Sequence, residues 1–61
     1  MVIAINNNQE KNNRTEFHQI SSEAFEVKIY RAGYNKGTWE LSKQWYFDSF
    51  TKAETFFNNI K

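Results

Sequence analysis

Residues 25–30 read FEVKIY, a stretch in which apolar and polar side chains alternate. Phe25, Val27 and Ile29 share one face of this segment, and Tyr30 lies on the other face with two charged residues. A period of two is typical of a β-strand with one buried face. The fold must therefore contain a sheet, and another element must cover the apolar face of this strand.

Two glycines after this strand indicate a tight turn. Gly33 and Gly37 bracket residues 34–36, and glycine allows the positive φ angles that a hairpin loop needs. A second strand follows, in which Trp39 and Leu41 share a face. We therefore predict a β-hairpin whose loop lies between the two glycines.

Lys43 complicates the continuation of the second strand. An unbroken strand over residues 38–48 would place Lys43 in the middle of a row of large apolar side chains. A lysine in a buried row is costly unless it is paired or reaches water. We therefore expect a turn or bulge at residues 42–44 and a third strand over residues 45–48. One long bulged hairpin is the alternative.

The C-terminal residues have the pattern of an amphipathic helix. Four apolar residues fall at i, i+3, i+4 and i+7 and so share one stripe: Ala53, Phe56, Phe57 and Ile60. Thr51 followed by Glu54 matches the S/T-x-x-E capping box, in which each side chain satisfies a free backbone N–H group. We expect the helix to begin at this box and to pack its Ala53, Phe56 and Ile60 edge on the apolar face of residues 25–29.

The N-terminal segment, residues 1–23, is less regular. Residues 1–5 are apolar and fit an edge strand, whereas residues 6–14 (NNNQEKNNR) contain no apolar side chain and are typical of a loop. Residues 15–20 fit a helix or a short strand equally well. We expect residues 24–61 to form the hairpin, the meander and the helix.

These patterns predict an α+β fold in a single domain over residues 1–61. The expected architecture is a small antiparallel β-meander of about three strands, with an extra N-terminal strand as an option. A single C-terminal α-helix covers one face of the sheet. Sixty-one residues leave room for one domain only.

Aromatic residues exceed what a core of this size can hold. The chain contains six Phe, three Tyr and two Trp, which make up 18% of its residues. A domain of this length buries only about 60% of the surface of its unfolded chain. Some aromatic side chains must then lie on the surface or in an interface, where Tyr and Trp are enriched.

The predicted contact surface combines these surplus aromatic residues with a local basic bias. Between residues 28 and 43 there are four basic residues and one acidic residue. Basic and aromatic residues on a sheet can contact phosphates and stack on bases, although lysines at a hairpin tip also serve simply to solvate it. The candidate partner-binding residues are Lys28, Tyr30, Arg31, Tyr34, Lys36, Lys43 and Tyr46.

Catalytic, cofactor and metal sites are not expected. The chain has no Cys and one histidine, His18, so the usual zinc ligands are missing. It contains no nucleophile elbow, no HExxH motif and no phosphate-binding glycine loop. We expect His18 to be an ordinary surface histidine and Asp48 to shape the start of the helix.

Charge and hydropathy rank the partner classes. The net charge of +1 lacks the basic surplus that is typical of a nucleic-acid-binding protein. No apolar run reaches the roughly 18 residues of a membrane span, and no signal peptide is recognised. We therefore expect a cytoplasmic location and no membrane contact.

The function that fits these observations is a non-enzymatic binding protein with a protein partner. It would be a phage or mobile-element inhibitor that occludes the working surface of a host protein, for example in anti-defence. The alternative is a nucleic-acid-binding domain that uses the same sheet face or hairpin. A homodimer formed through an uncovered sheet face is compatible with either function.

Two partial resemblances concern the C-terminal half. Residues 39–54 are similar to the strand–strand–helix end of integrase arm-binding domains, which dock a three-stranded sheet on DNA. Residues 47–54 resemble the end of WGR-type domains, although residues 31–34 lack the tryptophan and second arginine of that family. Both resemblances cover a minority of the chain and assign it to neither family.

Overall fold

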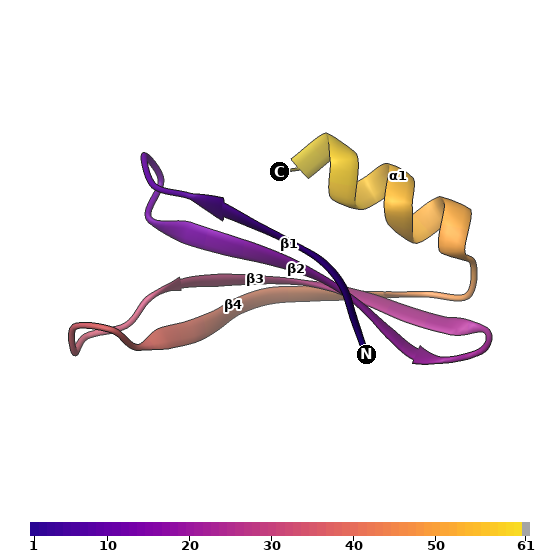
Figure 1. Ribbon diagram of the computed structural model, residues 1–61, viewed down its shortest axis with the longest axis horizontal. Coiled ribbons are helices and arrows are strands. Elements are labelled where there is room, and N and C mark those ends of the chain that lie inside the picture. The colour runs from indigo at the N-terminus through magenta and orange to yellow at the C-terminus, as the bar shows by residue number, and fades with distance from the viewer. Residues whose placement is uncertain (61) are drawn as a thin grey trace.

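The computed structural model describes residues 1–60 and contains a four-stranded antiparallel sheet and one helix (Figure 1). The strands lie in the sheet in chain order, so each pairs with its sequence neighbours. The elements are β1 (Val2–Asn8), β2 (Asn13–Ser21), β3 (Ala24–Ala32), β4 (Trp39–Phe47) and α1 (Phe50–Ile60). The predicted α+β meander with a C-terminal helix is confirmed, and the optional N-terminal strand is present.

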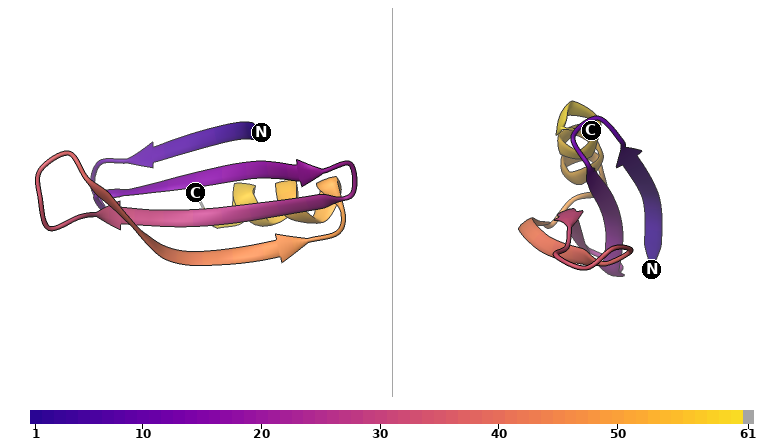
Figure 2. Two further views of the ribbon diagram at one scale, coloured as in Figure 1. Left: turned by 90° about the horizontal axis from the view of Figure 1, so that it is seen from below. Right: turned by 90° about the vertical axis from the view of Figure 1, so that its left-hand side faces the viewer.

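The core lies between α1 and the middle of the sheet. Figure 2 shows the helix along one face of a sheet that curves towards it. Phe17 and Val27 are almost fully buried beneath the helix, and Ala53 and Phe57 are the buried helical residues. The Phe17 ring centroid lies 5.7 Å from that of Phe57 and 5.5 Å from that of Phe50. The predicted helical stripe therefore packs on the sheet. Within it, the predicted Ala53, Phe56 and Ile60 edge is corrected, because Phe57 and not Phe56 joins Ala53 in the buried centre.

Phe56 extends this packing to the edge of the sheet. Its ring centroid lies 4.7 Å from that of Trp45 and 5.3 Å from that of Phe47, both on β4. All three side chains are half-buried. Phe56 thus covers β4, while Ala53 and Phe57 belong to the buried centre.

The polar residues 6–14 do not form a loop, contrary to the sequence prediction. Asn6, Asn7 and Asn8 continue β1 and pair with residues of β2, which leaves only a short turn from Gln9 to Asn12. An edge strand needs little burial of its own when its neighbour supplies backbone partners, so tertiary context overrides the low strand propensity of Asn.

Residues 15–20 belong to strand β2, which removes the ambiguity between helix and strand. Thr15 and Phe17 are buried on the helix side, and the residues between and after them lie on the opposite side. The register shifts between Gln19 and Ser21, so Ile20 is a bulged residue and is 55% exposed. The sequence spacing of Phe17 and Ile20 therefore reflects a bulge and not a helical turn.

The predicted third strand over residues 45–48 is wrong, and the alternative of one long bulged hairpin is correct. Strand β4 is continuous, and its pairing with β3 shifts between Lys43, opposite Ile29, and Leu41, opposite Tyr30. Ser42 is the extra residue. A bulge adds one residue to one strand and so reverses the alternation of its side chains. As a result, Trp39 and Leu41 face away from the helix, and Lys43 lies on the helix side with an exposed side chain.

The β3–β4 loop agrees with the turn predicted from its glycines. Gly37 has a φ angle of +85°, which an L-residue rarely adopts. The backbone N–H of Gly33 donates a hydrogen bond to the carbonyl oxygen of Thr38 at 2.8 Å. Both glycines are therefore explained by the turn.

The helix begins two residues earlier than the predicted capping box. The backbone N–H of Lys52 donates to Ser49 Oγ at 3.5 Å, and that of Ala53 donates to the Ser49 carbonyl oxygen at 3.1 Å. Ser49 is thus the N-cap residue, and Thr51 lies inside the first turn. The reason is packing, because the Phe50 ring must lie in the first turn to reach Phe17. Asp48 lies before the cap, where the Lys52 ammonium is 3.5 Å from its carboxylate.

Replacement of the cap residue tests this assignment. Ser49→Ala should lower the free energy of unfolding by about 0.5–1 kcal/mol, because the side-chain acceptor of the first turn is lost and the hydrogen bond is long. Thr51→Ala should leave stability almost unchanged, since Thr51 is exposed. Urea unfolding followed by circular dichroism measures both. A larger loss of unfolding free energy in Thr51→Ala than in Ser49→Ala would show instead that Thr51 is the N-cap residue.

Candidate binding surface on the uncovered sheet face

The face of the sheet opposite α1 has no layer packed on it among residues 1–60. We call it the open face. Side chains paired across neighbouring strands point to the same side of a sheet, so the strand register defines its members. They are Val2, Ile5 and Asn7 from β1, Arg14, Glu16 and His18 from β2, Glu26, Lys28, Tyr30 and Ala32 from β3, and Trp39, Leu41, Gln44 and Tyr46 from β4.

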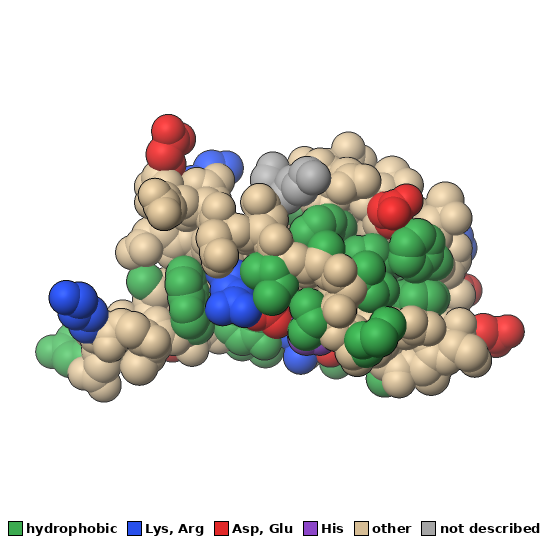
Figure 3. Space-filling model, viewed as in Figure 1, with side chains coloured by type: hydrophobic (Ala, Val, Ile, Leu, Met, Phe, Trp, Pro, Cys, Tyr) green, Lys and Arg blue, Asp and Glu red, His purple; other side chains and the backbone are tan. Residues whose placement is uncertain are grey.

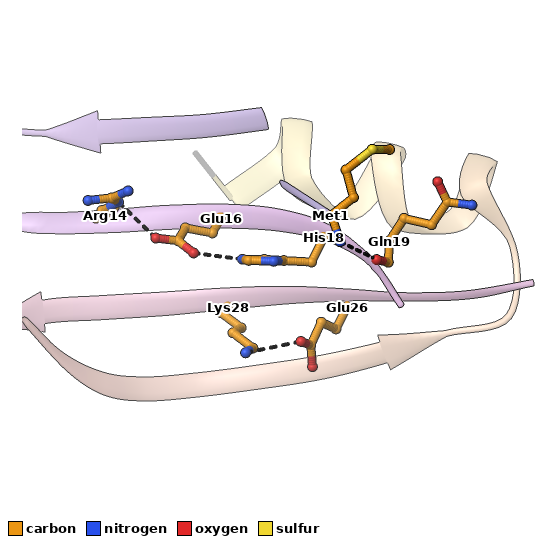
Figure 4. A network of polar contacts seen from close by, with 7 residues as sticks. All are labelled: Met1, Arg14, Glu16, His18, Gln19, Glu26 and Lys28. Atoms are coloured by element: carbon orange, nitrogen blue, oxygen red, sulfur yellow. Dashed lines mark hydrogen bonds and ion pairs between the residues drawn. The ribbon is translucent and has the colours of Figure 1, made fainter. Parts of the chain in front are cut away.

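The centre of the open face is a grid of compensating charges (Figure 4). Along β2, Glu16 Oε2 lies 2.8 Å from Arg14 Nε and Glu16 Oε1 lies 2.6 Å from His18 Nε2. Along β3, Lys28 Nζ lies 3.0 Å from Glu26 Oε1. Glu16 is also the cross-strand neighbour of Lys28, and His18 that of Glu26. Each carboxylate therefore has a basic neighbour along its own strand and another across the sheet.

The two carboxylates are buried more deeply than an uncovered face would suggest. Glu26 is only 9% exposed, and the side chain of Glu16 is 13% exposed. A buried carboxylate is costly without a partner, so both acids depend on their basic neighbours. The neighbours are less buried, with Lys28 at 23% and Arg14 at 31% side-chain exposure.

Lys28 connects this grid to two of the surplus tyrosines. Its hydrogen bond with the Glu26 carboxylate and the charge of that group raise the pKa of Lys28, and burial opposes the shift only in part. The phenol groups of Tyr30 and Tyr46 act in the same upward direction on this pKa. Lys28, Tyr30 and Tyr46 therefore form one neighbourhood at the centre of the open face.

Exposed apolar side chains flank the charged grid on both sides. On β4, Tyr46 is 66% exposed, Leu41 49% and Trp39 41%. On β1, Val2 is 46% exposed and Ile5 is 43% exposed. The space-filling view from the side shows apolar side chains reaching the surface along the length of the sheet (Figure 3). The open face is thus apolar at its two margins and polar at its centre.

The structure separates the seven predicted contact residues into three groups. Lys28, Tyr30 and Tyr46 share the open face. Tyr34, which is 97% exposed, and Lys36 lie in the β3–β4 loop. The remaining two predicted residues, Arg31 and Lys43, are on the helix side of the sheet.

Several residues of the open face were not identified from the sequence. Leu41 was predicted only to share a face with Trp39, and its outward direction depends on the bulge at Ser42. Arg14 and Glu16 were assigned to a loop and to an ambiguous segment. Their alternation with Thr15 and Phe17 was the signal that could have placed them on a strand.

No cluster of metal-ligating side chains accompanies this surface in the described part of the chain. Residues 1–60 contain no group of three or more His, Asp or Glu side chains placed to hold a metal ion. They also contain no helix that is long and apolar enough to cross a membrane. No protein-family model, curated protein or solved structure matches this chain. Any functional proposal must therefore be based on the surface itself.

The pairing of Lys28 with Glu26 can be tested by titration. Glu26→Gln should lower the pKa of Lys28, because it removes the acceptor charge that raises it. A raised lysine pKa stabilises the fold below the unfolded-state pKa and loses this contribution as the pH rises through the folded-state value. The stability difference between wild type and Glu26→Gln should therefore shrink at high pH. NMR titration of the lysine side chains measures the shift.

Lys43 is the internal control for that titration. It lies on the opposite side of the sheet and has no carboxylate partner in the described chain. The chemical shifts of its side chain at neutral pH should be the same in both proteins. A Lys28 curve that does not move in Glu26→Gln would contradict the ion pair.

Proposed function

We propose that this chain is a non-enzymatic binding protein that recognises a protein partner through the open face. The observation that carries the proposal is the combination of a self-neutralised charged centre with large exposed side chains on β4. Tyr46 and Leu41 are the most exposed of these side chains. Tyr is enriched at interface hot spots, where a rigid amphipathic ring buries much area at little cost in rotamer entropy.

The open face is long and narrow. The principal extents of the molecule are 35 × 20 × 15 Å, and the open face lies along the longest and the shortest of them (Figures 1 and 2). Its projected area of about 525 Å² is below the roughly 800 Å² per partner of a standard protein–protein interface, so it suits a small interface.

The state of the basic residues argues against a nucleic-acid partner. Binding to phosphates requires several clustered cations that are free to replace counterions. On the open face, Arg14 and Lys28 are already close to carboxylates. The two unpaired lysines of the predicted patch, Lys36 and Lys43, lie at the loop and on the helix side. Nucleic-acid binding is therefore the weaker alternative.

A small protein of this type would act by covering its partner. Its effect on a bound protein would be to occlude that protein's working surface. Inhibition of a host protein by a phage or mobile element is the biological setting that we propose. The paired charges would give such a face orientation and specificity, since misplaced partners bring like charges together.

The proposal predicts that the open face, and not the helix, contacts the partner. A photo-cross-linking residue at Gln44, on the open face of the edge strand β4, should capture a protein from host lysate, and the product should survive nuclease treatment. The same residue at Thr55, exposed on α1, should capture nothing. Equal capture from both positions, or a product that nuclease removes, would overturn the proposal.

Side-chain truncation gives the matching affinity test on the captured partner. The double variant Tyr46→Ala with Leu41→Ala should weaken binding by about 2 kcal/mol or more, roughly thirtyfold, because it removes two exposed anchors. The control is Thr55→Ala with Asn58→Ala on the exposed side of α1. Isothermal titration calorimetry measures both, and circular dichroism confirms that the fold is retained.

A further inference from the structure

A hollow of about 350 Å³ lies at the end of the sheet where the β1–β2 turn approaches the start of β4. Five of the residues that line it have amide side chains: Asn7, Asn8, Gln9, Asn12 and Asn13. Trp39 and Arg14 complete the wall. We call this site the amide hollow. Trp39 follows Arg14 by 25 positions in the sequence, so only folding brings Trp39 close to the other residues of the hollow.

Two structural features form the amide hollow: a backbone hydrogen bond that holds the β1–β2 turn and the bulge at Ser42. Asn12 adopts a positive φ of 55°, and its carbonyl oxygen accepts a hydrogen bond from the Ala32 N–H at 3.2 Å, which ties the β1–β2 turn to the end of β3. Trp39 is the cross-strand partner of Ala32. The bulge at Ser42 places Trp39 on the open side of the sheet, where Arg14 also lies.

Most hydrogen-bonding groups of the amide hollow have no protein partner. Asn8 Oδ1 accepts a hydrogen bond from the Lys11 N–H at 3.0 Å. The other four amide side chains make no hydrogen bond within residues 1–60. Arg14 Nε is buried and makes no hydrogen bond of good geometry, although Glu16 Oε2 lies 2.8 Å away. The amide groups without a protein partner are available to a ligand.

The chemistry of the wall defines the ligand class. A carboxamide offers both donors and an acceptor, which matches hydroxyl groups that also donate and accept. Trp39 is 41% exposed and presents a flat apolar surface of the kind on which the C–H face of a sugar ring packs. No carboxylate lines the hollow, and the charge of Arg14 is compensated by Glu16. We propose that the amide hollow binds a neutral saccharide of one or a few rings.

The volume supports a small ligand. Ligand pockets typically measure about 300–1,000 Å³, so this hollow is at the small end of the range. A nucleobase would also stack on Trp39 and hydrogen-bond to amides. However, a nucleic acid brings phosphates, and Arg14 is the one cation of the wall. Its pairing with Glu16 therefore favours an uncharged ligand.

Trp39 supplies the signal for the test. The other tryptophan, Trp45, packs on Phe56 at 4.7 Å between the ring centroids on the helix side. In a Trp45→Phe background, fluorescence reports on Trp39 alone. The titrants are maltotriose, cellotriose and triacetylchitotriose, with single-stranded octadeoxyadenylate as the nucleic-acid arm. We expect a saturable change with at least one trisaccharide, together with NMR shifts of the Asn7 and Gln9 side-chain amides.

Variants separate this site from the proposed protein-binding surface. Asn7→Ala with Gln9→Ala should weaken saccharide binding about tenfold, as expected for two lost hydrogen bonds. Tyr46→Ala with Leu41→Ala should leave it unchanged, which keeps the two proposals independent. The saccharide site is overturned if no trisaccharide gives saturation at about 10 mM, tenfold above a weak Kd of roughly 1 mM. It is also overturned if only the oligonucleotide binds.

Discussion

The contact between the Phe17 ring and the helix is the constraint on which the rest of the structure depends. Phe17 has ring neighbours on both sides of the core, with centroid distances of 6.3 Å to Phe25 and 5.7 Å to Phe57. The chain has no disulfide and no second layer on the other face of the sheet. A small core without a disulfide or a second covering layer has a low free energy of unfolding. The single helix is therefore what makes the sheet a folded domain.

A one-sided core determines what the other face must be. Without a covering layer among residues 1–60, the polar residues of the open face must satisfy one another. Arg14 pairs with Glu16 and Lys28 pairs with Glu26, and His18 lies within hydrogen-bond distance of Glu16. Such ion pairs add little net stability when exposed, but Glu16 and Glu26 are mostly buried, so loss of a basic partner would be costly. The grid thus keeps the face polar at its centre and leaves recognition to the apolar margins.

The fold was predictable where one local pattern matched one structural role. The alternation around Val27 and the stripe from Ala53 to Ile60 each specify an element, and both are found. The cap was misplaced because Ser49 has no Glu partner three residues later, whereas the packing of Phe50 requires an earlier start. The strand at Asn6 to Asn8 has no local signal, because β2 holds it through backbone pairing.

The candidate site was predictable only in part. The outward direction of Tyr30 and Tyr46 follows from strand alternation. That of Trp39 and Leu41 does not, because it depends on which residue of β4 is left unpaired by β3. The amide hollow depends in addition on how the β1–β2 turn meets the end of β3. The direction of these side chains and the shape of the hollow depend on the strand register, which no single segment of the sequence specifies.

The bulge at Ser42 divides β4 into two halves whose large apolar side chains point to opposite faces of the sheet. Trp45 and Phe47 pack against the core, whereas Trp39 and Leu41 are exposed on the open face. Ser42, which has no partner on β3, separates the two pairs. Loss or gain of a single codon there would exchange the outward residues of one half and leave the other half in place. A lineage could therefore acquire or discard a recognition surface in one genetic step, without repacking the core that keeps the protein folded.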